Sequence, residues 1–132
     1  PNLYGDILTD EAAQMQGGVG TAGAANIGDK WSMFEAIHGS APRMVQEGRA
    51  QYADPCSMIK ASSMLLRHIG FSEQAERIDM ALEICGQFEK KIQITGRDNG
   101  ATGEEYTKYL LSWYDDADLK SKYDAFTSNL VA

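Results

Sequence analysis

Cysteine, histidine and long apolar runs are scarce in this chain of 132 residues. Its two cysteines, Cys56 and Cys85, are too few for a disulfide framework and have no histidine at the spacing of a zinc site, so we expect buried free thiols. No run approaches the roughly 18 apolar residues of a membrane span, and no basic start followed by an apolar stretch indicates a secretory signal. We therefore expect a cytoplasmic protein with no membrane partner.

Positive charge is also in short supply, because 12 Lys and Arg face 19 Asp and Glu for a net charge of −7. Repulsion from the phosphate backbone argues against nucleic acid as a partner, and repulsion from anionic headgroups argues against a membrane surface. What the chain does contain is 43% hydrophobic residues, enough for one core. The composition predicts a single domain or part of one.

Apolar spacing and turn residues predict more helices than strands. Asp54 followed by Pro55 is a typical helix start, Gly70 is a typical stop, and Thr102 with Glu105 has the pattern of a capping box. Helices are predicted over 10–16, 54–70, 72–86, 102–113 and 117–130, and strands over 32–37 and 91–95. Strands separated by helices indicate an α/β fold with helices packed on a sheet. Two or three strands cannot cover so many helices, so we expect an incomplete sheet and the C-terminal part of a longer chain.

Two carboxylates stand where an extended segment is predicted to turn into the first helix. Asp6 and Asp10 are four residues apart, so they share one helical face. At a helix start both would meet the positive end of the macrodipole and stay ionised, which suits Mg²⁺ or Mn²⁺. The alternative is that one of them merely caps the helix.

Two later segments are candidates for binding a phosphate group. Gly18-x-Gly20-x-x-Gly23 matches the dinucleotide fingerprint but lacks the preceding strand, the following helix and the later acid, so close packing of glycines explains it better. The small-residue loop 38–42 follows a predicted strand, and its backbone N–H groups could hold phosphate or ribose oxygens. Arg43 adds a fixed positive charge suited to a phosphate monoester. An ordinary tight turn is the alternative.

Several motifs together resemble one known family. Asn-Leu-Tyr-Gly-Asp-Ile-Leu-Thr-Asp-Glu-Ala, Gly-Gly-Val-Gly, Ala-Asn-Ile-Gly-Asp, Phe-Glu-Ala-Ile-His-Gly-Ser-Ala-Pro and Met-Leu-Leu-Arg-His-Ile-Gly stand in the order found in the C-terminal part of the isocitrate and isopropylmalate dehydrogenases. The similarity runs from Asn2 to about Tyr109. It implies that residues 1–132 are the C-terminal portion of the large, cofactor-binding domain of that fold, which binds nicotinamide dinucleotides without a Rossmann fingerprint.

The resemblance also implies site residues. Asp6 and Asp10 match two aspartates that bind the divalent metal, with a third acid coming from the partner subunit of a homodimer. The positions that match the adenosine end of the cofactor site are His38, Gly39, Ser40, Ala41, Pro42, Arg43, Met44, Asp54, Arg97 and Asp98.

Three of these positions bear on the choice of cofactor. Arg43 stands where NAD-dependent members commonly have Asp and NADP-dependent members a basic residue, which favours NADP over NAD. Met44 departs from the Tyr often found in NADP-dependent isocitrate enzymes, so the preference is small. Asp54 stands where the family usually has an adenine-contacting Asn.

By resemblance, the parent protein would use NADP or NAD and Mg²⁺ or Mn²⁺ to convert isocitrate, a small 2-hydroxy acid, to 2-oxoglutarate by oxidative decarboxylation. Phe34-Glu35-Ala36 is closer to the isocitrate members than to the isopropylmalate members. The catalytic Tyr and Lys of the family lie upstream of these residues, so no catalytic residue is assigned and the chain by itself is expected to be inactive. Alternatives are an isopropylmalate, homoisocitrate or tartrate dehydrogenase, or a noncatalytic nucleotide-binding or regulatory subunit, against which the intact Asp6 and Asp10 argue.

Overall fold

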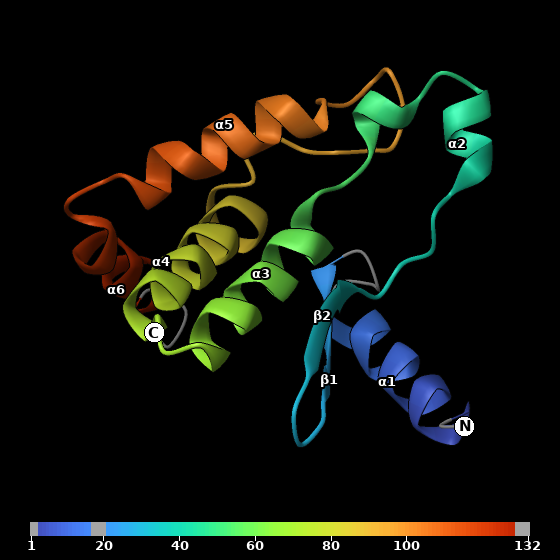
Figure 1. Ribbon diagram of the computed structural model, residues 1–132. Coiled ribbons are helices and arrows are strands. Elements are labelled where there is room, and N and C mark those ends of the chain that lie inside the picture. Colours follow the sequence, from blue (N-terminus) through green and yellow to red (C-terminus); the bar gives the residue numbers. More distant parts are fainter. Residues whose placement is uncertain (1–2, 17–20, 129–132) are drawn as a thin grey trace.

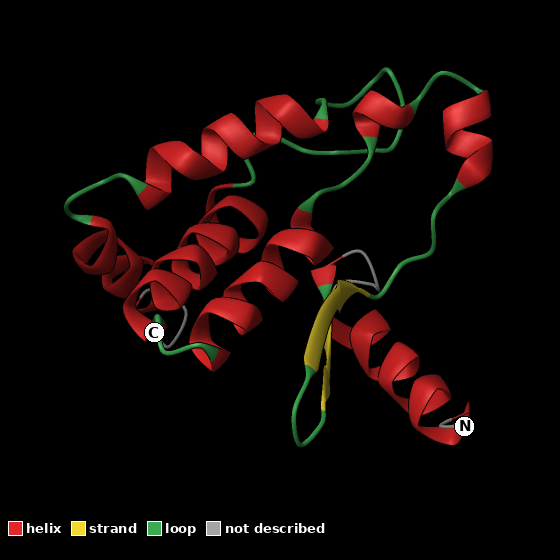
Figure 2. Ribbon diagram, viewed as in Figure 1, coloured by secondary structure: helices red, strands yellow, loops and turns green. Residues whose placement is uncertain are grey.

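The computed structural model describes residues 3–16 and 21–128 (Figure 1). The elements in chain order are α1 (Leu3–Gln16), β1 (Gly23–Ile27), β2 (Ser32–Ala36), α2 (Pro42–Gln46), the 3₁₀ turn η2 (Ala50–Tyr52), α3 (Cys56–His68), α4 (Ser72–Glu83), the π-helix η3 (Ile84–Glu89), α5 (Gly103–Tyr114) and α6 (Leu119–Ser128). The fold is a mostly helical α/β arrangement with a small sheet (Figure 2).

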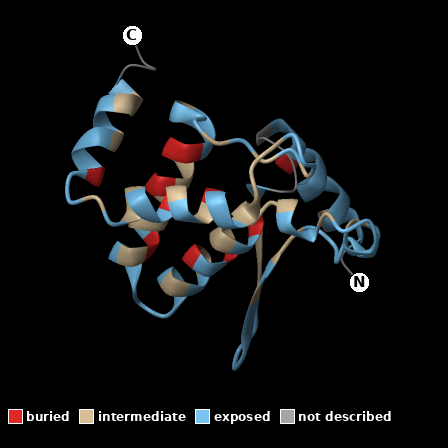
Figure 3. Ribbon diagram, turned by 90° about the horizontal axis from the view of Figure 1, so that it is seen from above, coloured by how far each residue is buried: buried red, intermediate tan, exposed pale blue. Residues whose placement is uncertain are grey.

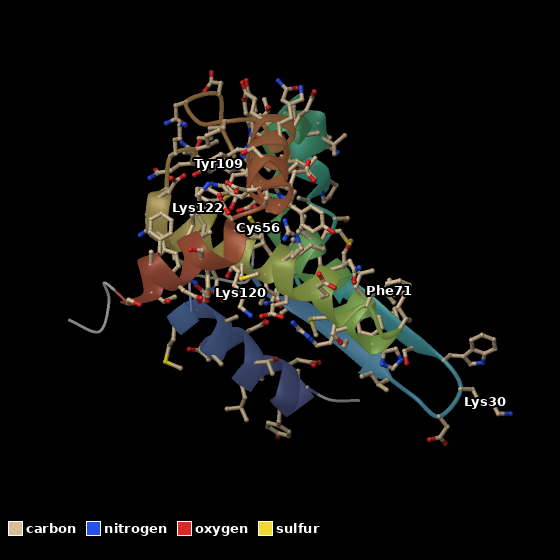
Figure 4. All side chains as sticks on the ribbon, turned by 90° about the vertical axis from the view of Figure 1, so that its left-hand side faces the viewer. Lys30, Cys56, Phe71, Tyr109, Lys120 and Lys122 are labelled. Carbon is tan, nitrogen blue, oxygen red and sulfur yellow. The ribbon has the colours of Figure 1, made fainter. Side chains whose placement is uncertain are left out.

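The sheet of the described residues is a two-stranded antiparallel hairpin. Gly23 pairs with Ala36 and Ile27 with Ser32. Strand β2 matches the predicted strand but is largely exposed instead of buried, and β1 was not predicted. The two strands are consecutive in the chain, whereas strands separated by helices, at 32–37 and 91–95, were expected. Lys30 lies in the turn at the far tip of the hairpin (Figure 4).

The predicted strand over 91–95 is also wrong. These residues form an irregular segment that folds back on itself, because the backbone N–H of Ala101 donates to the carbonyl of Gln93 at 2.9 Å. An extended apolar segment becomes a strand only when another strand offers a ladder to pair with. The segment therefore lies beside the helices without pairing, and its Ile92 and Ile94 pack against a buried cluster of α4, η3 and α5.

The core lies where α4 meets α3, α5 and α6 (Figure 3). One buried cluster joins α4, η3 and α5 through Ala81, Cys85, Tyr106 and Leu110, and a second joins α4, η3 and α6 through Met80, Ile84 and Leu119. Phe88 stacks on Phe126 with ring centroids 5.5 Å apart, which extends the second cluster. Most of the apolar burial therefore comes from helix packing, and α3 also packs against both strands of the hairpin.

Local capping signals set the helix ends largely as predicted. Asp54 accepts a hydrogen bond from the Cys56 N–H at 2.9 Å, and the left-handed Gly70 (φ +94°) follows the end of α3. Thr102 and Glu105 exchange both bonds of a capping box at the start of α5. Helix α4 ends three residues before its predicted end, because the chain continues as the π-helix η3.

Helix α1 differs most from expectation. It is already helical at Leu3, so Asp6 and Asp10 lie within the helix, and the extended segment predicted to lead into it is not present at residues 3–9. Ala13 is its buried side chain among the described residues, while Tyr4 is 81% and Met15 87% exposed. Figure 1 shows α1 beyond the hairpin, away from the packed helices.

Candidate functional site

The loop after β2 is fixed by one buried side chain of α3. Ser57 is fully buried; its hydroxyl donates to the carbonyl of Ala22 and accepts the N–H of Ile37 at 3.1 Å. This places both ends of the hairpin against the start of α3. The loop that begins at His38 therefore leaves the sheet from a fixed point.

An apolar pocket of about 770 Å³ opens where this loop faces the segment 94–96. Such a volume is within the usual range of sites for small molecules and cofactors. Its lining residues come from the loop, α2, η2 and the segment before α3: His38, Gly39, Ser40, Ala41, Met44, Val45, Ala50, Tyr52, Ala53, Asp54, Ile94, Thr95 and Gly96. The pocket thus joins segments that are far apart in the sequence and lie at the same end of α3 and α5 in Figure 1.

Two backbone features of the loop suit a ligand. A Cβ placed on Gly39 would meet nothing within 4 Å, so packing in the described protein does not demand glycine there. Ala41 has φ +45°, a left-handed conformation that costs a non-glycine residue roughly 1 kcal/mol. Nδ1 of His38 lies 2.9 Å from the Gly39 carbonyl, which only accepts, so a proton on Nδ1 would satisfy this contact.

A polar pocket of about 720 Å³ adjoins the apolar one at Tyr52. It is lined by charged and polar groups of α2, η2 and the 97–98 turn: Arg43, Glu47, Gly48, Arg49, Gln51, Tyr52, Arg97 and Asp98. Three arginines face two carboxylates here, so its formal charge is positive although the chain is acidic. Hydrogen bonds from Arg49, and next from Arg43, lower the pKa of Glu47, which keeps this carboxylate ionised.

The structure brings most of the predicted cofactor residues to these two pockets. His38, Gly39, Ser40, Ala41, Met44 and Asp54 line the apolar pocket, and Arg43, Arg97 and Asp98 line the polar one. Pro42 lines neither and instead begins α2. The carboxylate of Asp54 already accepts the N–H of Cys56, so part of its hydrogen-bonding capacity serves α3.

Sequence reasoning missed Glu47 and Arg49, which lie in the polar pocket only a few residues after Arg43. Their charges were read as part of an ordinary polar stretch. The signal that could have found them is the spacing, since Arg43 and Glu47 are four apart and pair on a helical face.

The predicted metal residues lie on α1, outside both pockets. Asp6 and Asp10 are exposed and stand one helical turn apart, as predicted. Two carboxylates suit a hard cation but supply only part of its roughly six oxygen ligands. Within residues 3–16 and 21–128, no group of three His, Cys, Asp or Glu side chains could hold a metal ion. Asp6 and Asp10 therefore suit a divalent cation but form an incomplete ligand set for it.

Several other expectations have a clear outcome. Gly23 supports close packing over a phosphate loop, because a Cβ there would meet the Ala61 backbone nitrogen at 2.7 Å; Gly18 and Gly20 lie outside the described residues. Both cysteines are free, as expected, but only Cys85 is buried and Cys56 is half-buried; burial raises the pKa of each thiol to about 12, which disfavours the thiolate at neutral pH. No helix in the described part of the chain is long and apolar enough to cross a membrane.

Comparison with known proteins shows the class of this chain, which is that of a dehydrogenase family. Residues 1–108 match the family model described as isocitrate/isopropylmalate dehydrogenase. The chain belongs to the isocitrate/isopropylmalate dehydrogenase family, as the motif resemblance implied.

Relatives of both kinds match. The chain is 45% identical over 101 residues to a 3-isopropylmalate dehydrogenase of Corynebacterium glutamicum, covering 74% of this chain and 26% of that protein. It is 49% identical over 80 residues to an NADP isocitrate dehydrogenase of Rickettsia typhi, covering 61% of this chain and 16% of that protein. The chain thus spans about a quarter or less of these curated relatives.

Two solved structures share the fold. The isocitrate dehydrogenase from Methylococcus capsulatus superposes with a TM-score of 0.72 at 34% identity, over 87% of this chain and 33% of that one. The TT0538 protein from Thermus thermophilus superposes with a TM-score of 0.75 at 31% identity, over 88% of this chain and 23% of that one. The α/β class is therefore confirmed by structures as well as by sequence.

Proposed function

We propose that this chain forms the C-terminal portion of the large domain of a metal-dependent dehydrogenase that oxidises and decarboxylates isocitrate to 2-oxoglutarate with NADP or NAD. The observation that carries the proposal is the pair of adjoining pockets around residues 38–54. An apolar pocket beside a cationic one suits an adenosine group next to a phosphate. Nine of the ten cofactor residues predicted from the sequence line this pair.

Different pocket residues would hold different parts of the dinucleotide. The apolar walls at Met44 and Ile94 would exclude water from the adenine ring, and Gly39 leaves space for close approach of the ribose. Arg43 and Arg97 border the polar pocket, where a 2′-phosphate would find two guanidinium groups. When bound, the nicotinamide at the other end of the cofactor supplies the hydride acceptor.

Asp6 and Asp10 would hold Mg²⁺ or Mn²⁺ through their carboxylate oxygens. The metal, when bound, supplies Lewis-acid stabilisation of negative charge on the substrate. Because α1 supplies only two ligands, further ligands must come from substrate, water or another part of the enzyme. This requirement fits a homodimer with a shared active site, in which a partner subunit completes the set.

The substrate assignment rests on Phe34-Glu35-Ala36 before the loop and on the isocitrate dehydrogenases among the relatives. Isopropylmalate is the second candidate, because a 3-isopropylmalate dehydrogenase matches over the larger share of this chain. Both substrates are 2-hydroxy acids, so the same metal and hydride chemistry serves either.

The test is a steady-state assay of the intact enzyme with Mg²⁺, in which isocitrate is compared with isopropylmalate and NADP with NAD. Isocitrate is expected to give the higher kcat/KM. A preference for isopropylmalate would replace the substrate but keep the reaction class. Absence of turnover with any 2-hydroxy acid, together with retained nucleotide binding, would favour a noncatalytic subunit.

A further inference from the structure

Arg49 joins the two segments that carry the other arginines of the polar pocket. Its Nη2 and Nε bind the same oxygen of Glu47, at 2.5 and 2.9 Å. Its Nη1 donates to the carbonyl of Gly96 at 2.6 Å, across 47 positions of the chain. One guanidinium group therefore ties the end of α2 to the turn that contains Arg97.

Glu47 extends this tie to Arg43. Its second carboxylate oxygen accepts the Nε of Arg43 at 2.6 Å, so the carboxylate stands between two arginines. The Arg43 side chain is 87% exposed and the Arg49 side chain 34%. Glu47 thus holds a highly exposed arginine in a defined position, and the less exposed Arg49 holds Glu47.

The charges give this arrangement a consequence for an anionic ligand. With Arg43 as its only partner, Glu47 would cancel the charge of that arginine. Because Arg49 also binds Glu47, the three side chains together keep one net positive charge. A bound phosphate monoester, with a charge of about −1.5 to −2 near pH 7, would meet Arg43 already held by Glu47, in a pocket that Arg97 also lines.

We propose that Arg49 is a positioning residue for recognition of the 2′-phosphate of NADP, acting through Glu47 on Arg43 and through the Gly96 carbonyl on the turn that bears Arg97. The inference rests on the proposed function, because it takes a nicotinamide dinucleotide as the ligand. Arg49 itself is turned toward protein acceptors, so its contribution is geometric more than direct.

The test compares the intact wild-type protein with Arg49→Lys by calorimetric titration with NADP and with NAD, which differ by the 2′-phosphate. A lysine keeps the charge but lacks the planar fork that reaches Glu47 and Gly96 together. The ratio of the NAD to the NADP dissociation constant is expected to fall roughly tenfold, equivalent to about 1.4 kcal/mol of lost discrimination. Arg49→Gln, which also removes the charge, should lower the ratio further.

Arg67→Lys is the matched control, because Arg67 also pairs with a carboxylate, that of Asp79 at 2.7 Å, but lies outside both pockets. This variant should keep the wild-type ratio. Thermal unfolding of each variant checks that the fold is retained. In the assayed enzyme, Arg49→Lys should raise the KM for NADP with little change in kcat.

The outcomes separate the two proposals. A wild-type protein that binds neither dinucleotide would refute the proposed function, and the role of Arg49 with it. A wild-type protein that binds both, beside an Arg49→Lys variant with an unchanged ratio, would refute the role of Arg49 alone. Equal weakening of NAD and NADP would also refute it, since the arginine would then serve the pocket's structure and not the phosphate.

Discussion

Replacing Ser57 by alanine tests the link between the buried end of α3 and the candidate cofactor loop. The substitution removes one oxygen that is fully buried and that serves two backbone groups, the carbonyl of Ala22 and the N–H of Ile37. A buried polar group left without a partner costs about 1–3 kcal/mol. Partial relaxation of the two groups toward solvent lowers the sum, so we expect Ser57→Ala to lose about 2 kcal/mol of unfolding free energy.

The expected loss converts to a measurable shift in melting temperature. An unfolding entropy of roughly 2.1 cal/mol/K per residue gives about 0.28 kcal/mol/K for a chain of this length, so about 2 kcal/mol lowers Tm by about 7 °C. Thermal unfolding followed by circular dichroism measures it. Binding of NADP, measured by titration at a temperature where both proteins are folded, should also weaken, because the loop begins directly after Ile37.

Ser62→Ala is the matched control on the same helix. The Ser62 hydroxyl is exposed and, among the described residues, bonds the Met58 carbonyl one turn earlier, so its removal should change stability by less than about 0.5 kcal/mol. If Ser57→Ala and Ser62→Ala melted together, Ser57 would not anchor the hairpin. If Ser57→Ala melted early but bound NADP as wild type does, it would anchor the fold without positioning the loop.

Three further tests address separate features. Asp10→Asn in the intact enzyme should lower Mg²⁺-dependent turnover at least tenfold, roughly the loss of one metal ligand, while the adjacent Glu11→Gln should not; equal activities would remove Asp10 from the metal site. Gly23→Ala should lower the free energy of unfolding by about 1–3 kcal/mol, because the added methyl group would meet the α3 backbone. Gly39→Ala should leave stability unchanged and weaken nucleotide binding. Unfolding experiments and nucleotide titrations would test both. Asp79→Asn should destabilise the protein above pH 3.8 and progressively less below it, as urea unfolding at several pH values would show.

The sign for Asp79 follows from its surroundings. Burial raises its pKa, but hydrogen bonds from Lys60, Arg67 and Ser63 outweigh burial and set the pKa below the ordinary value of 3.8. A lowered pKa means that the ionised form stabilises the folded state. The contribution is complete above the unfolded pKa and is lost as the pH falls through the folded one. Wild type and variant should therefore converge in acid.

Local chemistry made the helix ends predictable. The cap at Thr102 and the stop at Gly70 depend on neighbours within four residues, and both are observed; the Asp54 carboxylate accepts the Cys56 N–H, but the N-cap of α3 is Pro55. Strand β1 was missed because Gly23 and the alanines after it have low strand propensity, and their pairing depends on a partner strand. The apolar alternation around Ile92 and Ile94 is typical of a strand and predicted one. The described residues offer this segment no ladder partner, so no strand forms there.

The candidate site shows the same difference between local signals, which the sequence reveals, and long-range contacts, which it does not. The loop at His38 was found because small residues in succession are visible in the sequence. The contact of Arg49 with Gly96 was not predicted, because the two residues are 47 positions apart and neither residue type indicates the pairing. Glu47 was missed although its position four residues after Arg43 is visible in the sequence. Sequence therefore found the pocket residues that belong to a local motif more readily than those joined by a distant contact.

Ser57 bonds both ends of the hairpin that lies between the proposed metal residues and the proposed cofactor loop. It bonds Ala22, where the chain enters the hairpin after the helix of Asp6 and Asp10, and Ile37, where the chain leaves the hairpin for the cofactor loop. A dehydrogenase must hold its metal and its hydride acceptor at one fixed separation, since a misplacement of about 1 Å can cost on the order of 10²-fold in rate. Among the described elements, the hairpin lies between α1 and the cofactor loop along the chain, and the buried hydroxyl of Ser57 in α3 bonds both of its ends. A change at Ser57 should therefore lower kcat in the intact enzyme as well as cofactor affinity, whereas Arg49→Lys should change affinity alone.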